Sequence, residues 1–139
     1  MASVAAEDSA LAHSILDQIA DAVIYADTAG TIVLWNGAAV ALFGWSAEEA
    51  VGRSLDLIIP EHLQKAHWPA FEAAVTSGVM GLEGRPTVTR AKHRSGRKLY
   101  VEMTFALVRH GGGAARGAVA VARDVTERIE LQRASKPAV

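Results

Sequence analysis

The segment Lys98–Leu107, with the sequence KLYVEMTFAL, alternates apolar and polar side chains along its whole length. Successive side chains of a β-strand point to opposite faces, so a period of two predicts a strand with one buried face. Strands of this kind are typical of antiparallel sheets that are covered on one side only. The sequence therefore predicts a half-buried antiparallel strand, from which the neighbouring segments can be interpreted.

Four further β-rich segments are bounded by turn residues. A turn at Arg94–Gly96 precedes the alternating strand, and a loop at Gly111–Gly113 follows it. The turn at Asp27–Gly30 combines an aspartate, which can bond its own backbone, with a glycine, which accepts a positive φ. These signals predict strands over Val23–Ala26, Thr31–Trp35, Pro86–His93 and Gly117–Arg123.

Helical patterns begin the chain and follow the first hairpin. The first helix is predicted from about Ser9, with its apolar side chains spaced by three or four in one stripe: Leu11, Ile15, Ile19 and Ala22. Asn36 can cap a short helix over Ala38–Phe43. The segment Ser46–Glu49 has the pattern of a capping box and predicts a second short helix.

A longer helix is predicted to end before Gly78, and a last one to run from Asp124, as its cap, to about Ala134. The longer helical segment is predicted to begin at about Ala66. Because proline removes one helical hydrogen bond, the regular part of this helix is expected to start within a turn of Pro69. Helices interposed among antiparallel strands predict an α+β fold, with a five-stranded sheet, short helices on one face and flanking terminal helices. The space between helices and sheet is a natural pocket.

Composition excludes several classes of function. The chain has 139 residues, no cysteine and a formal net charge of −1, so it holds no disulfide, Cys-ligated zinc or flavin–cysteinyl adduct. Near-neutral charge argues against a nucleic-acid partner, and no apolar run is long enough for a membrane span. A single cytoplasmic domain over residues 9–134 is expected, between flexible ends at 1–8 and 135–139.

A set of motifs, in this order and spacing, resembles the PAS domain family from about Ser14 to Arg133. The motifs are Asp27–Gly30 with Ile32–Asn36, Leu42–Gly52, Ile59–Glu61, Arg94–Gly96 and Asp124–Arg128. The resemblance implies the PAS fold, a sensory or protein-interaction role, dimerisation through the flanking helices, and a ligand pocket between the sheet and the central helices.

Within that family, Pro60–His67 resembles the haem-binding oxygen sensors of the FixL type, in which a proline stands seven residues before the proximal histidine. The resemblance implies that His67 ligates the haem iron, and it places three residues on the distal side: Leu82, Met103 and Phe105. Thr87 stands where that subfamily has a distal arginine, with Arg85 and Arg90 nearby in the sequence. Ala73 stands where a residue pairs with a haem propionate.

The residue pattern around His67 allows two interpretations. On a helix His67 shares a face with Ala70, Phe71, Ala74 and Val75. An imidazole among apolar neighbours suits ligation of a haem iron, and it equally suits a structural histidine packed in the fold. Met103 could approach a ligand or fill the core. The three tryptophans, Trp35, Trp45 and Trp68, could stack on a flavin or pack in the core and rim.

No motif calls for catalysis or a zinc site. His62 and His67 are five residues apart, unlike H-E-x-x-H, and the six Lys and Arg residues between Arg85 and Lys98 fit a solvated hairpin face. The sequence therefore predicts a non-catalytic sensory module that binds a small molecule or cofactor, b-type haem before flavin, at His67, Phe71, Leu82, Met103 and Phe105. The alternative is a ligand-free interaction module.

Two kinds of protein partner are expected. The stripe on the first helix favours a homodimer, because a small sheet is not expected to cover it completely. No effector segment follows the last helix, so the output is expected to pass through a signalling partner, through dimer rearrangement, or within a longer parent protein.

Overall fold

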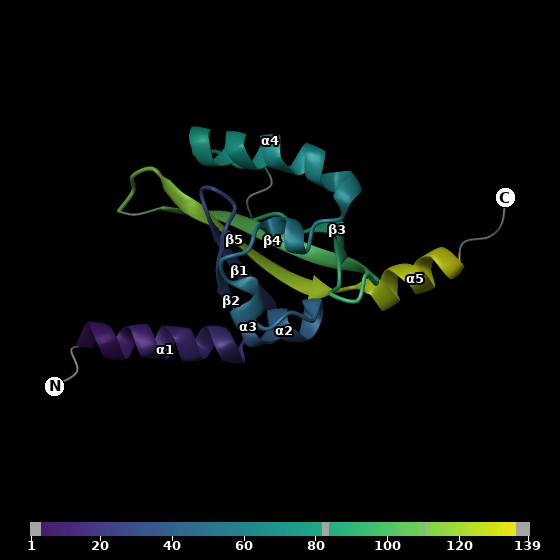
Figure 1. The fold of residues 1–139 in the computed structure, drawn as a ribbon, viewed down its shortest axis with the longest axis horizontal. Helices are drawn as coiled ribbons and strands as arrows, with labels where there is room; N and C mark the ends of the chain where they lie inside the picture. The colour runs from purple at the N-terminus through teal and green to yellow at the C-terminus, as the bar shows by residue number, and fades with distance from the viewer. Residues whose placement is uncertain (1–3, 82–83, 110, 136–139) are drawn as a thin grey trace.

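A five-stranded antiparallel sheet in the order β2-β1-β5-β4-β3 forms the centre of the fold (Figure 1). The computed structural model describes residues 4–81, 84–109 and 111–135. The strands are β1 (Ala22–Asp27), β2 (Ile32–Trp35), β3 (Thr87–Lys92), β4 (Lys98–Arg109) and β5 (Ala115–Asp124). The helices are α1 (Val4–Gln18), α2 (Gly37–Phe43), α3 (Ala47–Ala50), the 3₁₀ helix η1 (Leu55–Leu57), α4 (Glu61–Ser77) and α5 (Thr126–Ala134).

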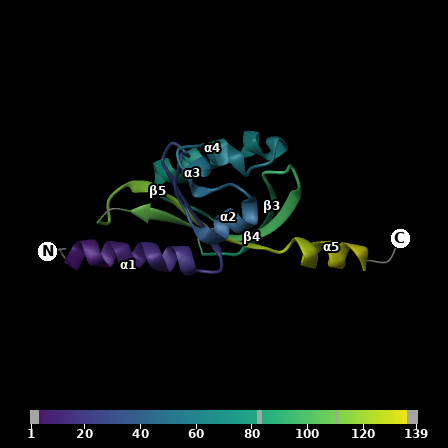
Figure 2. The ribbon, with the colours of Figure 1, turned by 60° about the horizontal axis from the view of Figure 1, so that its bottom comes forward.

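The predicted α+β architecture is confirmed. Inward residues of β4 alternate with half-buried ones, and Leu99 and Val101 are fully enclosed. They pack with Phe43 of α2 and Ile58, which follows η1, in one apolar core on a single face of the sheet. Helix α4 forms a separate layer beyond the sheet, and α1 and α5 extend from opposite ends of the molecule (Figures 1 and 2).

Several predicted boundaries are wrong. Helix α1 begins at Val4, earlier than the expected Ser9, and ends at Gln18. Ile19 therefore lies past its end, and Ala22 does not continue its stripe and is instead buried in β1. The residue that precedes α5 is Val125 rather than Asp124, whose Oδ1 accepts the amide hydrogen of Thr126 at 2.9 Å. Of the predicted flexible ends, residues 4–8 belong to helix α1, and residues 1–3 and 136–139 lie outside the described residues.

Helix α4 begins at Glu61, well before Pro69, which contradicts the expected start of its regular part. A proline has no amide hydrogen, so the carbonyl of Lys65 receives no helical bond from position 69. Both residues are exposed, and water can bind that carbonyl. The helix therefore continues through the proline and ends where Gly78 adopts φ 74° and donates its amide hydrogen to Ala74.

The fully buried side chain of Asn36 joins three elements. Its Oδ1 accepts hydrogen bonds from the backbone of Val23 in β1, at 2.8 Å, and of Ala39 in α2, at 3.0 Å. Its Nδ2 donates to the carbonyl oxygens of Leu16 in α1, at 2.7 Å, and of Asp21, at 3.0 Å. One amide group therefore sets the end of α1, the start of β1 and the start of α2.

None of the described helices is long and apolar enough to cross a membrane.

Replacement of Asn36 by alanine is expected to lower the free energy of unfolding by about 2–4 kcal/mol, because it removes a helix cap and leaves buried backbone groups without partners. Urea denaturation measures the change. Ser46→Ala is the matched control, because Ser46 caps α3 through a purely local capping box and should cost about 1 kcal/mol. Equal losses in the two variants would show that the longer-range bonds of Asn36 add nothing.

Candidate functional site

An apolar cavity of about 560 Å³ lies between α4 and the inner face of the sheet. This volume falls within the range of small-molecule and cofactor sites, which is roughly 300–1,000 Å³. Helix α4 contributes His67, Phe71 and several alanines, the segment after it contributes Val79, Met80 and Gly81, and the floor comes from all strands except β2. The polar side chains in the lining are His67, Ser77 and Thr89.

The cavity exists because small residues face one another across it. On α4 the inward positions include Ala70 and Ala74, and no residue of this helix is fully buried. On the sheet, Ala118 lies opposite Ala26 in the register of β5 and β1, and Ala120 lies beside it on the same face. Methyl groups on both sides cannot fill the gap between helix and sheet, so the gap remains open.

Trp68 attaches α4 to the rest of the fold. Its Nε1 donates a hydrogen bond to Oδ1 of Asp56, in η1, at 2.7 Å. Its ring covers Gly30, the last residue of the β1–β2 turn, which adopts φ 80° and where an added Cβ would collide with the ring. A glycine is thus required there both for its backbone conformation and for the close approach of the indole. These two contacts of Trp68 hold α4 in place over the β1–β2 turn, at one side of the cavity.

His67 lies next to this anchor and lines the cavity. Its ring centre is 4.7 Å from that of Trp68 and 5.7 Å from that of Phe71. Its Nδ1 is buried and has no hydrogen-bond partner among the described residues. Burial lowers the pKa of His67 below its ordinary value of 6.5, and the negative charge of Asp56 opposes this shift in part. The ring is therefore a neutral imidazole at neutral pH, the form that binds metal ions.

Four of the five residues predicted to bind a cofactor surround this one cavity: His67, Phe71, Met103 and Phe105. Leu82 lies outside the described residues. Val75, predicted on the same face as His67, instead lines a different groove beside the β1–β2 turn. No group of three or more metal-ligating side chains occurs in the part of the chain that the structure describes.

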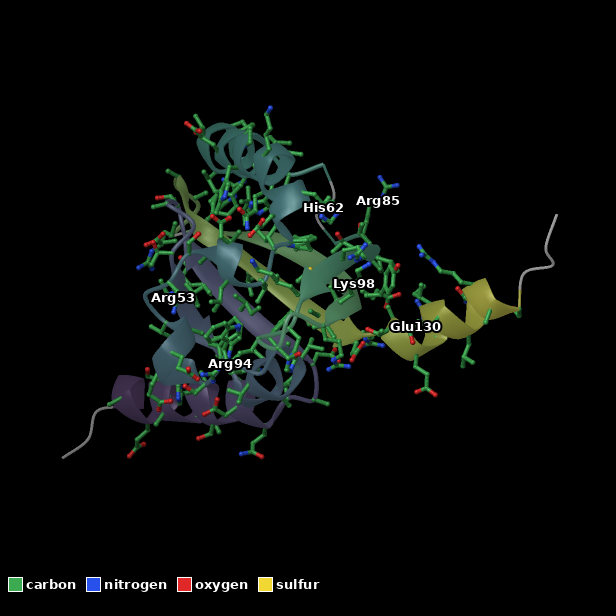
Figure 3. The ribbon with its side chains drawn as sticks, turned by 45° about the vertical axis from the view of Figure 1, so that its right-hand side comes forward. Arg53, His62, Arg85, Arg94, Lys98 and Glu130 are labelled. Carbon is green, nitrogen blue, oxygen red and sulfur yellow. The ribbon has the colours of Figure 1, made fainter. Side chains whose placement is uncertain are left out.

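The three tryptophans pack against other side chains and do not line the cavity. Trp35 is buried, with its ring centre 5.5 Å from that of Phe43. The guanidinium groups of Arg53 and Arg94 lie over the ring of Trp45, at 5.6 Å and 4.8 Å from its centre. These two arginines lie on the same side of the molecule (Figure 3). None of the three tryptophans lines the cavity, so a flavin would find no indole to stack on.

Sequence reasoning missed the packing of Arg90. Arg90 is one of the six basic residues interpreted as a solvated hairpin face. Arg94 fits that interpretation, because it is half exposed and pairs with Glu49 at 2.8 Å. The Nε of Arg90, in contrast, is buried, and its guanidinium carbon lies 5.6 Å from the ring centre of Tyr100, its partner in the register of β3 and β4.

Known proteins share both the sequence pattern and the fold. The sequence profile of the PAS fold matches residues 10–125. A protein of Azorhizobium caulinodans is 35% identical over 123 residues, which are 88% of this chain and 16% of that protein. Sensor protein FixL of Bradyrhizobium diazoefficiens is 30% identical over 120 residues, which are 86% of this chain and 23% of that protein. The chain thus spans less than a quarter of either relative.

Among solved structures, the PAS domain of a protein from Colwellia psychrerythraea has a TM-score of 0.73 and 22% sequence identity. The match covers 87% of this chain and 99% of that domain. The match confirms the predicted fold over nearly the whole chain.

Because burial lowers the pKa of His67, the stability of the protein is expected to depend on pH through this residue. In the unfolded chain the ring titrates near its ordinary value of about 6.5, so below that pH the unfolded state binds more protons than the folded state. The stabilisation is fully present above this value and is lost as the pH falls through the lowered pKa of the folded state. Between about pH 7.5 and about pH 5.5, wild type should therefore lose more unfolding free energy than His67→Phe.

Urea denaturation at both pH values provides the measurement, and the other histidines are common to the two proteins. His62→Phe serves as the control, because His62 is exposed near the start of α4 and should leave the pH dependence unchanged. Parallel losses in wild type and His67→Phe would show that His67 is not the buried titrating group.

Proposed function

This chain belongs to the PAS family, and we propose that it is a non-catalytic sensory module whose cavity binds a small apolar molecule or cofactor and transmits occupancy to the terminal helices. The observation that carries the proposal is the cavity itself, which is apolar, of ligand size and roofed by a helix fastened at one side. A structural core closes such a space, because each unfilled volume costs packing energy. The fact that this cavity is not filled by side chains therefore favours a bound ligand.

A b-type haem ligated by His67 is the most specific form of this proposal. The fit rests on a neutral, half-buried imidazole with an unpartnered Nδ1 and on the apolar side chains around it. Phe71, Met103 and Phe105 would contact the macrocycle. Haem, when bound, would supply an iron centre that can bind a small ligand or change its redox state, and His67 would hold it. The named relative FixL is a sensor protein, which agrees with this class of function.

A route from the cavity to α5 runs along β4. Met103 and Phe105 of this strand line the cavity, and Tyr100 lies near its start. The amide hydrogen of Tyr100 is donated to Oγ1 of Thr126 at 2.9 Å, and its carbonyl oxygen accepts the amide hydrogen of Val125 at 2.9 Å. These bonds tie the first turn of α5 to the strand, so a guest that displaces β4 would also reorient the helix.

The absorption spectrum of freshly purified protein tests the cofactor. A Soret band is expected for haem, whereas structure near about 450 nm would indicate flavin. His67→Ala should abolish or shift the Soret band, and the control His62→Ala should leave it unchanged because His62 is exposed and absent from the cavity lining. If reconstitution with haemin gives the same band in His67→Ala as in wild type, His67 is not the ligand.

A protein-interaction module is the second candidate, favoured by the surface of α1. Leu11 and Ile15 of α1 are 60% and 52% exposed, and Ile19, which follows the last residue of the helix, is 38% exposed. The helix extends away from the sheet (Figure 2). Exposed apolar stripes of this kind mark surfaces that other proteins cover. We propose that a second copy of the chain covers it, which is compatible with ligand binding and also with an empty cavity in a longer signalling protein.

Sedimentation equilibrium at tens of micromolar protein should give a dimer. Ile15→Glu is expected to shift the equilibrium to monomer, because a charge would have to be buried in the interface without a partner. The control is Val51→Glu, which places the same charge at an apolar residue that is 45% exposed after α3. A monomeric wild type, or equal dissociation in the two variants, would remove α1 as the dimer contact.

A further inference from the structure

Strand β3 lies at the edge of the sheet, and part of its outer edge is uncovered. Along an antiparallel strand, the backbone N–H and C=O groups of alternate residues point to opposite edges. The amide hydrogen of Lys92 is donated to the carbonyl oxygen of Ile58, at 2.9 Å, so alternate residues from Lys92 backwards face away from β4. The backbone groups of Val88 and Arg90 therefore point to the free edge, where no described residue bonds to them.

The opposite edge of the sheet, at β2, is paired with the segment that follows α3. The amide hydrogen of Ile32 is donated to the carbonyl oxygen of Arg53, and the carbonyl oxygen of Ile32 accepts the amide hydrogen of Gly52, each at 2.8 Å. Free backbone groups on an edge strand are a template for another strand. The uncovered stretch of β3 is therefore a place at which a further strand can join this sheet.

A groove of about 490 Å³ runs along this stretch. Its lining includes residues 88–90 of β3, whose side chains alternate between the two faces of the sheet. Leu63 of α4 borders the groove on the inner side, and three residues of α5 border it on the outer side: Ile129, Gln132 and Arg133. Strand β3 lies between α4 and α5 (Figure 2). The groove can therefore hold a strand beside β3, with a helix on each side.

The outer side of the groove is positively charged. The guanidinium carbons of Arg90 and Arg133 lie 5.6 Å and 4.9 Å from the ring centre of Tyr100, and neither group forms an ion pair among the described residues. The carboxylate of Glu102, on the same face, is already paired with Arg128 at 3.5 Å. No acidic side chain of the described part of the chain lines the groove, so an incoming chain meets two cations.

We propose that the free edge of β3 binds an extended acidic segment of a partner protein, which pairs antiparallel with Val88 and Arg90 as a sixth strand of the sheet. This inference goes beyond the proposed function and does not depend on the cavity. A partner residue that bonds to the backbone of Arg90 has its side chain on the outer face, where an acidic group meets Arg90 and Arg133. The next partner residue points inward beside Thr89 and Leu63, where an apolar side chain fits. The recognised sequence therefore alternates acidic and apolar residues.

The charges on β3 disfavour a second copy of this chain as the occupant. If two β3 strands paired edge to edge, their outer faces would bring together Arg90 and Lys92 of both copies. Like charges on neighbouring strands destabilise a sheet, and basic side chains on an edge strand oppose such self-pairing. An acidic segment replaces this repulsion with attraction.

Peptide binding to the wild-type protein tests the proposal, with fluorescence anisotropy as the measurement. The probe is a fluorescein-labelled, carboxyl-amidated peptide of sequence Glu-Val-Glu-Val-Glu. Methylation of the glutamate backbone nitrogens removes the hydrogens that would bond to β3, so the affinity should fall about 10-fold or more. Methylation of the valine backbone nitrogens is the matched control, because these point away from β3, and it should leave the affinity unchanged.

Protein variants and amide hydrogen exchange then locate the peptide. Arg90→Glu should weaken binding about 3- to 30-fold, because it places like charges opposite each other. Arg97→Glu is the control, since it changes the net charge equally at an exposed residue between β3 and β4, outside the groove. In wild type, saturation with the peptide should slow exchange of the amide hydrogens of Val88 and Arg90. That of Lys92, already bonded to Ile58, should change little.

Several results would overturn the inference, and none of them bears on the cavity. Absence of binding would show that this edge takes no acidic strand. Equal effects of the two methylations, or of Arg90→Glu and Arg97→Glu, would show attraction by net charge without strand pairing. Val88→Pro removes one free-edge amide hydrogen and leaves the pairing with β4 intact. If it converts a dimer to monomer in sedimentation equilibrium, a second copy occupies the edge.

Discussion

The hydrogen bond from Trp68 to Asp56, with the indole resting on Gly30, determines the position of α4 above the sheet. The cavity depends on this anchor, because no side chain of α4 is fully buried against the strands. The same contact orients the neighbouring His67 toward the space below the helix. Asn36 plays the corresponding role on the opposite side of the fold, where it joins α1, β1 and α2. Two polar side chains thus hold the framework around an interior that apolar packing leaves unfilled.

The order of strands and helices could be predicted from the sequence, because it depends on local signals. The alternation in β4 sets its buried face, and the Ser46–Glu49 capping box forms as expected. The start of α4 could not be predicted, because a tertiary contact, the hydrogen bond from Trp68 to Asp56, stabilises a helix that Pro69 locally disfavours.

The candidate site was predicted in part for a related reason. His67, Phe71, Met103 and Phe105 follow from helical and strand periodicity, which specify the face on which each side chain lies. The size of the cavity depends on alanines of α4, β1 and β5, and only the register of the sheet brings these together. The packing of Arg90 over Tyr100 depends on the pairing of β3 with β4, and strand order is not encoded in a local pattern.

The two faces of β3 and β4 carry different groups. On the inner face, Ala91 and Met103 line the cavity opposite His67 of α4. On the outer face, Arg90 lies beside Tyr100 in the register of the two strands, and the guanidinium groups of Arg90 and of Arg133 in α5 lie over its ring. The same two strands therefore border the proposed ligand on one face and contact α5 on the other, so a displacement of either strand would reach the helix.

Pro69 gives the roof of this cavity a mechanical property of its own. The missing hydrogen bond weakens the turn from Lys65 to Pro69, which includes His67 and the Trp68 anchor, whereas Ala70, Phe71 and Ala74 lie in the part of α4 beyond it. Helices bend most readily at such a break. A bend in this turn would therefore tilt the part of α4 beyond Pro69 and change the height of the cavity, while the bond from Trp68 to Asp56 keeps the turn itself attached to the fold.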